Sequence, residues 1–235
     1  MDRFLSLFSF DIITDALIVA IPALICITVH ELAHGYTAYK LGDNTAKDMG
    51  RLTLNPIKHI DIVGLAMILL VGFGWAKPVP VDMRNFKHPK AYMAVTAIAG
   101  PLSNLILAVI VIFVFLLFVP YNSMNLFLME LSFSDPPIIS QIIFRMALLN
   151  VMLAVFNLLP IPPLDGSKVV FSLLPENTYN KVMKYERFGM IFLLVLVFSG
   201  RFLSVDIFNI IVWRPAMAIF MSISDFAQTV IGFFG

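Results

Sequence analysis

Cysteine and charge are the scarcest features of this 235-residue chain. The single Cys26 lies within an apolar stretch, which excludes an internal disulfide framework. Lys and Arg total 16 and Asp and Glu total 15, so the formal net charge of +1 gives no reason to expect nucleic acid or an acidic partner. Only 13% of the residues are charged and 60% are hydrophobic, which leaves too little polar surface for a soluble domain of this length. The composition therefore predicts a protein embedded in a lipid bilayer.

Linkers and repeats are also absent from the sequence. No tract of Gly, Ser or Pro separates a second domain, and no internal repeat is visible. We therefore expect residues 1–235 to form a single membrane-embedded domain. The N-terminus lacks a cluster of basic residues and a small-residue cleavage site, so we interpret it as an uncleaved first span.

Long hydrophobic runs predict three spanning helices, at residues 11–39, 91–119 and 138–159. Each is long enough, at about 1.5 Å per residue, to cross a hydrocarbon core of about 30 Å. Two further apolar runs, 188–199 and 202–222, are interrupted by charged residues, so that one distorted crossing and two crossings are both open.

The shorter run at residues 62–74 cannot cross a bilayer and predicts a re-entrant or interfacial hairpin. The predicted fold class is an all-α polytopic membrane protein with about 4–6 hydrophobic segments. It would have a three-helix catalytic core and a short re-entrant or β-hairpin element around residues 62–81.

A metal-binding motif, His30-Glu31-Leu32-Ala33-His34, lies at the end of the first apolar run. Positions i and i+4 share one face of a helix, so His30 and His34 can bind one Zn²⁺ while Glu31 can reach the attacking water. An ionisable side chain at mid-bilayer costs about 2.5–3.5 kcal/mol on insertion scales, so the cluster needs a ligand, a cavity or a partner. The motif predicts a zinc hydrolase.

Two histidines leave a catalytic zinc one protein ligand short, because open zinc sites usually carry three. The soluble metzincin pattern would need Gly at position 37 and His at position 40, but the chain has Thr37 and Lys40, which excludes that class. Asp165 is favoured because it follows a proline-rich run, residues 158–164, at a depth that matches the histidines. Its alternative role is an ordinary Asp-Gly turn or helix N-cap. The remaining candidates are His59, His88, Glu130, Glu176 and Glu186.

The distribution of basic residues predicts the orientation of the chain. Lys and Arg gather in residues 40–58, 77–90 and 168–187, whereas residues 120–137 contain neither. Because short basic loops stay on the cytoplasmic side, we expect 120–137 outside and the zinc motif near the cytoplasmic side.

Four motifs in this order resemble those of the site-2 proteases, a family of intramembrane zinc metalloproteases, in the small type without a PDZ or CBS domain. The motifs are His30 to His34, Gly72 to Val81, Gly100 to Asn104, and Asn157 to Gly166. The resemblance implies that His30, His34 and Asp165 hold one Zn²⁺ per chain and that Glu31 is the catalytic base. It also implies a substrate that is a transmembrane or membrane-proximal segment of another protein. We expect the cytoplasmic membrane of a bacterium as the location, and the oligomeric state stays open.

Two asparagines within apolar helices, Asn104 and Asn157, have two possible roles. One is hydrogen bonding between helices, and the other is binding the substrate backbone or the oxyanion. The Gly100-Pro101 pair is expected to serve close packing and to start a helix.

The alternating prolines of residues 75–81 predict how the substrate is held. In a strand, the missing N–H groups of Pro78 and Pro80 fall on one edge, while Lys77, Val79 and Val81 keep their donors on the other. We expect the second edge to face the zinc site and to bind an unwound substrate by strand addition.

A metal-ion transporter or channel, with the His/Glu/Asp cluster as a transit site, is the competing class, because transporters also have broken helices and ionisable groups at the midplane. A transporter should show repeated halves and an exit pathway, and the sequence shows neither. The sequence therefore favours an intramembrane zinc endopeptidase that cleaves in or near transmembrane segments.

Overall fold

The computed structural model describes residues 10–64, 67, 75–118, 137–183, 186–202 and 204–234. In this part of the chain, four helices are long and apolar enough to cross a membrane. They cover Leu17–Lys40, Pro89–Leu117, Ile138–Asn157 and Asn209–Phe233. The predicted all-α polytopic membrane fold is confirmed.

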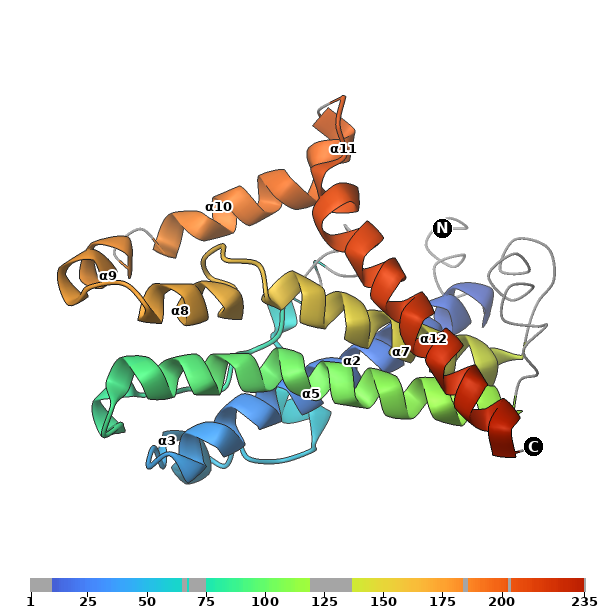
Figure 1. Cartoon of the computed structure of the whole chain (residues 1–235), viewed down its shortest axis with the longest axis horizontal. Coiled ribbons are helices and arrows are strands. Elements are labelled where there is room, and N and C mark those ends of the chain that lie inside the picture. Colours follow the sequence, from blue (N-terminus) through green and yellow to red (C-terminus); the bar gives the residue numbers. More distant parts are fainter. Residues whose placement is uncertain are drawn as a thin grey trace, which may run out of the picture.

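The first three spanning helices form the centre of the molecule (Figure 1). They are α2 (Phe10–Lys40), α5 (Pro89–Phe118) and α7 (Ile138–Asn157), and their bounds lie within two residues of the predicted ones. Each of the three packs against the other two. α2 begins at the end of the molecule where α5 ends and α7 begins, so the three alternate in direction.

The C-terminal region contributes one long helix to the described structure. After α10 (Glu186–Val197) and the short α11 (Ser199–Phe202), a π-helical turn, η3 (Asn209–Trp213), continues into α12 (Arg214–Phe234). α10 has 12 residues, too few to cross a bilayer as a helix. Of the two alternatives left open by the sequence, the described residues therefore favour one crossing, and α12 passes obliquely over α7 and α5 (Figure 1).

Small and aromatic side chains form the core between α5, α7 and α12. Ala108, Ala147 and Ala216 are fully or almost fully buried, one from each helix, which lets the backbones approach closely. The rings of Phe144 and Phe220 meet in a T-shaped contact with centroids 5.6 Å apart. This packing holds the helices that carry the polar groups of the site.

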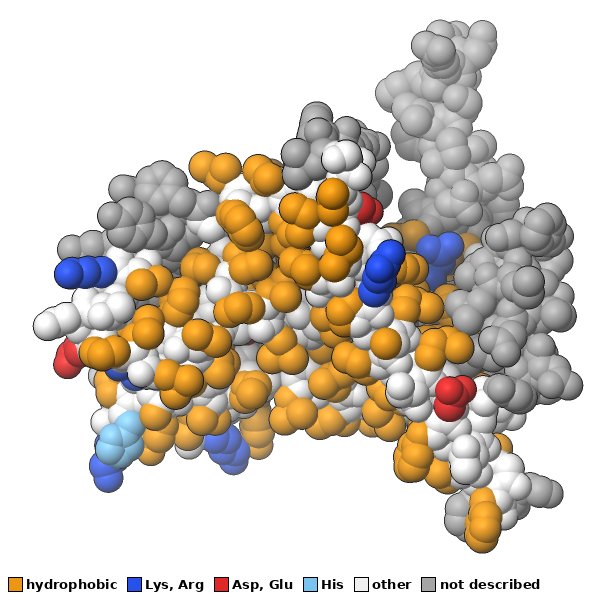
Figure 2. Space-filling model, turned by 45° about the horizontal axis from the view of Figure 1, so that its top comes forward, with side chains coloured by type: hydrophobic (Ala, Val, Ile, Leu, Met, Phe, Trp, Pro, Cys, Tyr) orange, Lys and Arg blue, Asp and Glu red, His pale blue; other side chains and the backbone are white. Residues whose placement is uncertain are grey.

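Hydrophobic side chains also cover most of the outer face seen in Figure 2, while His and several Lys and Arg side chains gather at one end. On α5 alone, Leu102, Ile106, Ile110 and Leu117 are exposed. An apolar outer surface of this kind is suited to contact with lipid tails.

Short helices and turns gather at this same end of the molecule, where α2 and α7 end and α5 begins (Figure 1). They are α3 (Thr45–Asp48), η1 (Pro56–His59), η2 (Met83–Asn85), α8 (Asp165–Ser172) and α9 (Glu176–Met183). Buried Asp43 joins two of these segments by accepting 2.7 Å hydrogen bonds from the backbone N–H of Asp82 and from Nδ2 of Asn85. This contact anchors the chain that leads out of residues 75–81.

Parts of three predicted elements lie outside the described residues: 65–66 and 68–74 of the re-entrant segment, residue 119 of the second span, and 120–136 of the outside loop. Residues 62–64 are helical, and residues 75–82 form no paired strand within the described structure. The predicted β-hairpin pairing is therefore not found in the described part of residues 62–81.

Candidate active site

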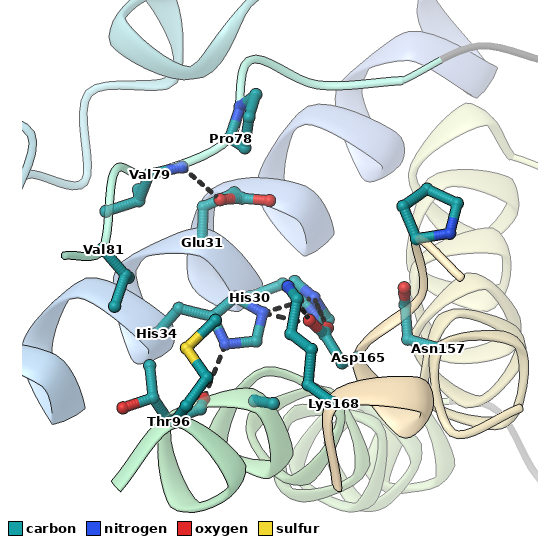
Figure 3. Close-up of a pocket in the computed structure, with 13 residues that line it drawn as sticks. His30, Glu31, His34, Pro78, Val79, Val81, Thr96, Asn157, Asp165 and Lys168 are labelled. Atoms are coloured by element: carbon teal, nitrogen blue, oxygen red, sulfur yellow. Dashed lines mark hydrogen bonds and ion pairs between the residues drawn. The ribbon is translucent and has the colours of Figure 1, made fainter. Parts of the chain in front are cut away.

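The two histidines of the helical motif and Asp165 meet in the interior of the protein (Figure 3). His30 and His34 lie one turn apart on α2, with their Nε2 atoms 3.0 Å from each other. Oδ2 of Asp165 lies 3.1 Å from Nε2 of His30 and 3.0 Å from Nε2 of His34. All three side chains are buried, and their potential ligand atoms all lie within 4.8 Å of one another. The fold thus brings a carboxylate 135 residues away onto the histidine pair.

The hydrogen bonds on the far side of each ring indicate a cation between the three residues. Nδ1 of His34 donates to the carbonyl oxygen of Thr96 at 2.7 Å, and Nδ1 of His30 donates to Oδ1 of Asn104 at 2.5 Å. With the proton on Nδ1, each neutral ring presents the lone pair of Nε2 to the other ring and to the carboxylate.

Three acceptor atoms so close together repel one another unless a cation lies between them. Zinc bonds of about 2.0–2.1 Å in a tetrahedron separate neighbouring ligand atoms by about 3.3 Å, near the observed spacing. Two imidazoles and one carboxylate are also a ligand set found in catalytic zinc sites. The residues present therefore fit Zn²⁺.

Asn104 holds His30 through buried amide groups that connect three helices. Besides accepting from His30 of α2, Asn104 of α5 donates from Nδ2 to Oδ1 of Asn150 on α7 at 2.6 Å and to the carbonyl oxygen of Cys26 at 3.2 Å. Nδ2 of Asn150 in turn donates to the carbonyl oxygen of Met146 at 2.8 Å. Both asparagines are fully buried. The amide of Asn104 is thus occupied by internal partners and orients a histidine, which does not fit the predicted contact with substrate.

Gly100 of α5 leaves space for the two rings. A Cβ at this position would lie 2.4 Å from Nε2 of His34 and 2.7 Å from Cε1 of His30. The expectation of close packing at Gly100-Pro101 is confirmed, but the helix start is wrong, because the pair lies inside α5. The atoms that lie closest to Gly100 belong to the rings of His30 and His34.

The proline-rich turn between α7 and α8 places Asp165 at the histidines. Asp165 is the first residue of α8, and Leu164 is the N-cap, so the alternative N-cap role of Asp165 is wrong. A Cβ at Gly166 would lie 2.2 Å from the carbonyl oxygen of Leu158, which shows how tightly the turn folds back. One turn further on, Nζ of Lys168 lies 3.1 Å from Oδ1 of Asp165. This ion pair occupies one carboxylate oxygen and leaves the other to face the histidines.

Glu31 lies beside the ligand cluster and is held by the backbone of residues 75–81. Its Oε2 accepts a hydrogen bond of 2.7 Å from the N–H of Val79 (Figure 3). Glu31 is half-buried, so it remains open to the cavity next to His30. A carboxylate next to a metal site and open to a cavity is suited to accept a proton from water.

Two cavities meet at these residues. The catalytic pocket, about 310 Å³, is lined by His30, Glu31, His34, Pro78, Val79, Val81, Met93, Thr96, Ala97, Asn157, Pro163, Asp165 and Lys168. The apolar pocket, about 200 Å³, is lined by Ile27, His30, Glu31, Trp75, Ala76, Leu153, Phe156, Asn157, Pro163, Leu164 and Leu193. The two pockets share His30, Glu31, Asn157 and Pro163, so Glu31 and one histidine of the cluster lie on their common wall.

The residues predicted to contact substrate divide into two groups. Val79, Val81 and Asn157 line the catalytic pocket, and Asn157 uses one amide N–H on the carbonyl oxygen of Leu153. Lys77 is not among the lining residues, and its N–H donates to the carbonyl oxygen of His59 at 3.0 Å. The backbone donor of Lys77 is therefore occupied by the segment that contains His59, and a contact between Lys77 and substrate stays a prediction.

The other candidate ligands that the structure describes lie apart from the cluster. His59 is buried and hydrogen-bonded to the carbonyl oxygen of Thr53 at 2.9 Å, whereas His88 and Glu176 are exposed. Glu130 lies outside the described residues, and the side chain of Glu186 is not described.

Comparison with known proteins identifies the family. The model of peptidase family M50 matches residues 17–135 and 129–199. The chain belongs to this family. The predicted membership of the site-2 proteases is therefore confirmed.

Relatives from bacteria cover most of the chain. The "Putative zinc metalloprotease YwhC" of Bacillus subtilis (strain 168) is 44% identical over 200 residues, which is 83% of this chain and 85% of the relative. Rip2 of Mycobacterium tuberculosis (strain H37Rv), with the same description, is 29% identical over 195 residues, 81% of this chain and 70% of the relative. No solved structure matches the chain.

Sequence reasoning missed two groups that contact His34 and Asp165. The Thr96 contact uses a backbone carbonyl, for which the sequence carries no signal. Lys168 was counted only as part of a basic loop, although its spacing of three residues from Asp165 on a helix could have indicated the ion pair.

Proposed function

We propose that this protein is an intramembrane zinc endopeptidase in which His30, His34 and Asp165 hold the metal and Glu31 is the catalytic base. One observation carries the assignment of roles. Buried His30 and His34 of a membrane-spanning helix lie against buried Asp165 of α8, with potential ligand atoms all within 4.8 Å of one another, and the carboxylate of Glu31 opens into the same cavity. Membership of peptidase family M50 supports peptide hydrolysis as the reaction.

Zinc at this site supplies Lewis-acid chemistry that polarises a peptide carbonyl and makes water a better nucleophile. Glu31 accepts the proton of the attacking water and passes it to the leaving amine. Asn104 and the carbonyl of Thr96 keep both Nε2 atoms directed at the metal position, and Lys168 holds Asp165 by its outer oxygen. The N–H of Val79 keeps Glu31 directed into the cleft.

The substrate in this proposal is a transmembrane or membrane-proximal segment of another protein. A helical segment satisfies its own backbone hydrogen bonds and must unwind before its carbonyl can reach the site. Pro78, Val79 and Val81 line the catalytic pocket, so an unwound segment in the pocket would lie along this stretch of backbone.

We also propose that the site lies near the cytoplasmic side of a bacterial cytoplasmic membrane. The relatives named above are bacterial. The ligands are near the ends of α2 and α7, at the end of the molecule that carries the basic short helices and turns (Figure 1). In a Cys26→Ser background, a cysteine at exposed Asn44 should resist an impermeant reagent from outside, while one placed between 121 and 135 should react. Labelling of both positions from the same side would contradict this orientation.

The deciding experiment separates metal binding from chemistry. Glu31→Gln should keep zinc but lose cleavage of a transmembrane peptide, because only the proton acceptor is removed. His30→Ala, His34→Ala and Asp165→Ala should lose both zinc and cleavage, because each removes a ligand. Zinc is measured on purified protein by elemental analysis and cleavage by mass spectrometry.

His88→Ala is the matched control, since His88 is exposed and lies apart from the cluster. It should retain zinc and activity. Full activity of Glu31→Gln would overturn the role of Glu31, and zinc loss in His88→Ala would overturn the ligand assignment. Neither the family comparison nor the described residues favour the metal-transport alternative.

A further inference from the structure

The apolar pocket has different walls from the catalytic pocket beside it. Ile27 comes from α2, Leu153 and Phe156 come from α7, and Leu193 comes from α10. Lys168, which lines the catalytic pocket, is not among its lining residues. Away from the shared residues, the apolar pocket is therefore a hydrophobic recess that opens beside the catalytic base.

α10 is a fixed wall of this recess. A Cβ at Gly189 would lie 1.9 Å from the carbonyl oxygen of Pro162, so the helix contacts the turn that leads to Asp165 without space for a side chain. One and two turns later, Leu193 and Leu196 are buried against Leu164. The position of Leu193 is thus set by the same turn that positions a metal ligand.

Residues 75–81 run along both cavities. Trp75 and Ala76 line the apolar pocket, whereas Pro78, Val79 and Val81 line the catalytic pocket. A substrate backbone paired with this segment would pass from one pocket to the other. Its carbonyl would pass His30 and Glu31 on the wall between them, so the residues on either side of the scissile bond would enter different pockets.

We propose that the apolar pocket is a subsite for one large apolar side chain, on a residue flanking the bond that is cleaved. This rests on the proposed function and adds a substrate preference to it. The occupant is apolar because, among the described residues, those that line only this pocket carry no charged side chain, and burying an unpaired polar group there is unfavourable. It is large because about 200 Å³ exceeds a cavity of about 150 Å³ that binds benzene.

The test uses transmembrane peptides that differ only at one residue flanking the cleaved bond, with Phe, Leu, Ala or Asp at that position. At the flank that enters the pocket, the wild type should cleave the Phe and Leu peptides with kcat/KM about 10-fold or more above the Ala peptide, and the Asp peptide more slowly still. Leu193→Trp should fill the recess and lower the Phe-to-Ala ratio about 10-fold. Leu193→Ala should enlarge it and shift the preference toward Trp.

Ile191→Trp is the matched control, because Ile191 lies on the same helix, is 61% exposed and lines neither pocket. It should leave the Phe-to-Ala ratio unchanged. Leu153→Trp fills the same recess from α7. If Leu193→Trp loses zinc, which would indicate that it does not fold, the Phe-to-Ala ratio of Leu153→Trp decides the outcome.

An unchanged ratio in both filling variants, with zinc retained, would overturn the subsite while leaving the proposed protease intact. Equal cleavage of all four peptides by the wild type, at either flank, would overturn it as well. Cleavage of no peptide by the zinc-loaded wild type, or equal cleavage by Glu31→Gln, would instead refute the proposed function.

Discussion

The backbone N–H of Val79 donates a 2.7 Å hydrogen bond to Oε2 of Glu31, 48 residues earlier in the chain. The bond joins the segment that runs along both pockets to the residue proposed as the base. It also means that the donor predicted to pair with substrate already has a partner inside the protein. A substrate strand that pairs with Val79 must therefore share or replace this contact with Glu31.

Replacing Val79 by Pro should lower kcat about 10-fold or more while zinc content stays near wild type. A hydrogen bond to a charged group contributes about 1.5–3 kcal/mol, and about 1.4 kcal/mol corresponds to tenfold in rate. Peptide cleavage and zinc analysis on the same preparation measure the two effects. Val79→Ala retains the N–H and serves as the control, so equal losses in both variants would assign the effect to the side chain.

Asn104→Leu should weaken zinc binding by about 10–100-fold, the usual effect of removing a group that orients a metal ligand. Asn157→Leu, by contrast, should keep zinc affinity and change only cleavage, because Asn157 lines the pocket without touching a ligand. Competition with a chelator measures the affinities. Tight zinc binding by Asn104→Leu would contradict the role assigned to its amide.

Gly100→Ala should abolish zinc binding and cleavage, even though Ala is favoured over Gly within a helix by about 1 kcal/mol. The added methyl group would occupy the space of the His34 ring, 2.4 Å from Nε2. Gly232→Ala on α12 is the control, since no atom lies within 4 Å of its Cβ position. That variant should keep zinc, and retention of zinc by Gly100→Ala would show that α5 can move away.

Asp43→Asn should lower the melting temperature at pH 7 by about 2–4 °C, the shift that about 1 kcal/mol produces in a protein of this size. Burial raises the pKa of Asp43, but hydrogen bonds from Thr45, Asn85 and the backbone N–H of Asp82 outweigh it and hold the pKa below its ordinary value. The stabilisation is therefore present above the ordinary value of about 3.9 and is lost as the pH falls through the lowered pKa.

Melting curves of the wild type and Asp43→Asn between pH 7 and pH 3 test this contribution. The difference in melting temperature should be largest at neutral pH and should shrink under acid. Parallel curves over the whole range would show that Asp43 does not contribute through its charge.

The spans and the cluster of His30, His34 and Asp165 could be predicted because both depend on local features of the sequence. The apolar runs mark α2, α5 and α7 by length alone, and the spacing of His30 and His34 places both on one helical face. The position of Asp165 was inferred from its bilayer depth, which matches that of the histidines. The structure brings these residues together, because the prolines before Asp165 interrupt the helix at a defined point.

The remaining features depend on which segments pack together. Lys77 has the alternation expected of an open strand edge, but residues around His59 cover that edge, and no local pattern encodes this contact. Asn104 lies within an apolar helix under either predicted role, and only the position of Asn150 on α7 decides between them. In the C-terminal region, charged residues interrupt the apolar runs, so hydropathy alone does not determine where α12 begins.

In the proposed function, the distance along the chain between the zinc ligands makes the site one of the last features to be completed during synthesis. His30 and His34 enter the membrane with the first helix, but Asp165 is made 135 residues after His30, when α5 and α7 have already followed. A nascent chain that ends before α8 has an incomplete ligand set and cannot build the three-ligand site. On this proposal, the complete three-ligand site exists only after the sequences of all three central helices have been made.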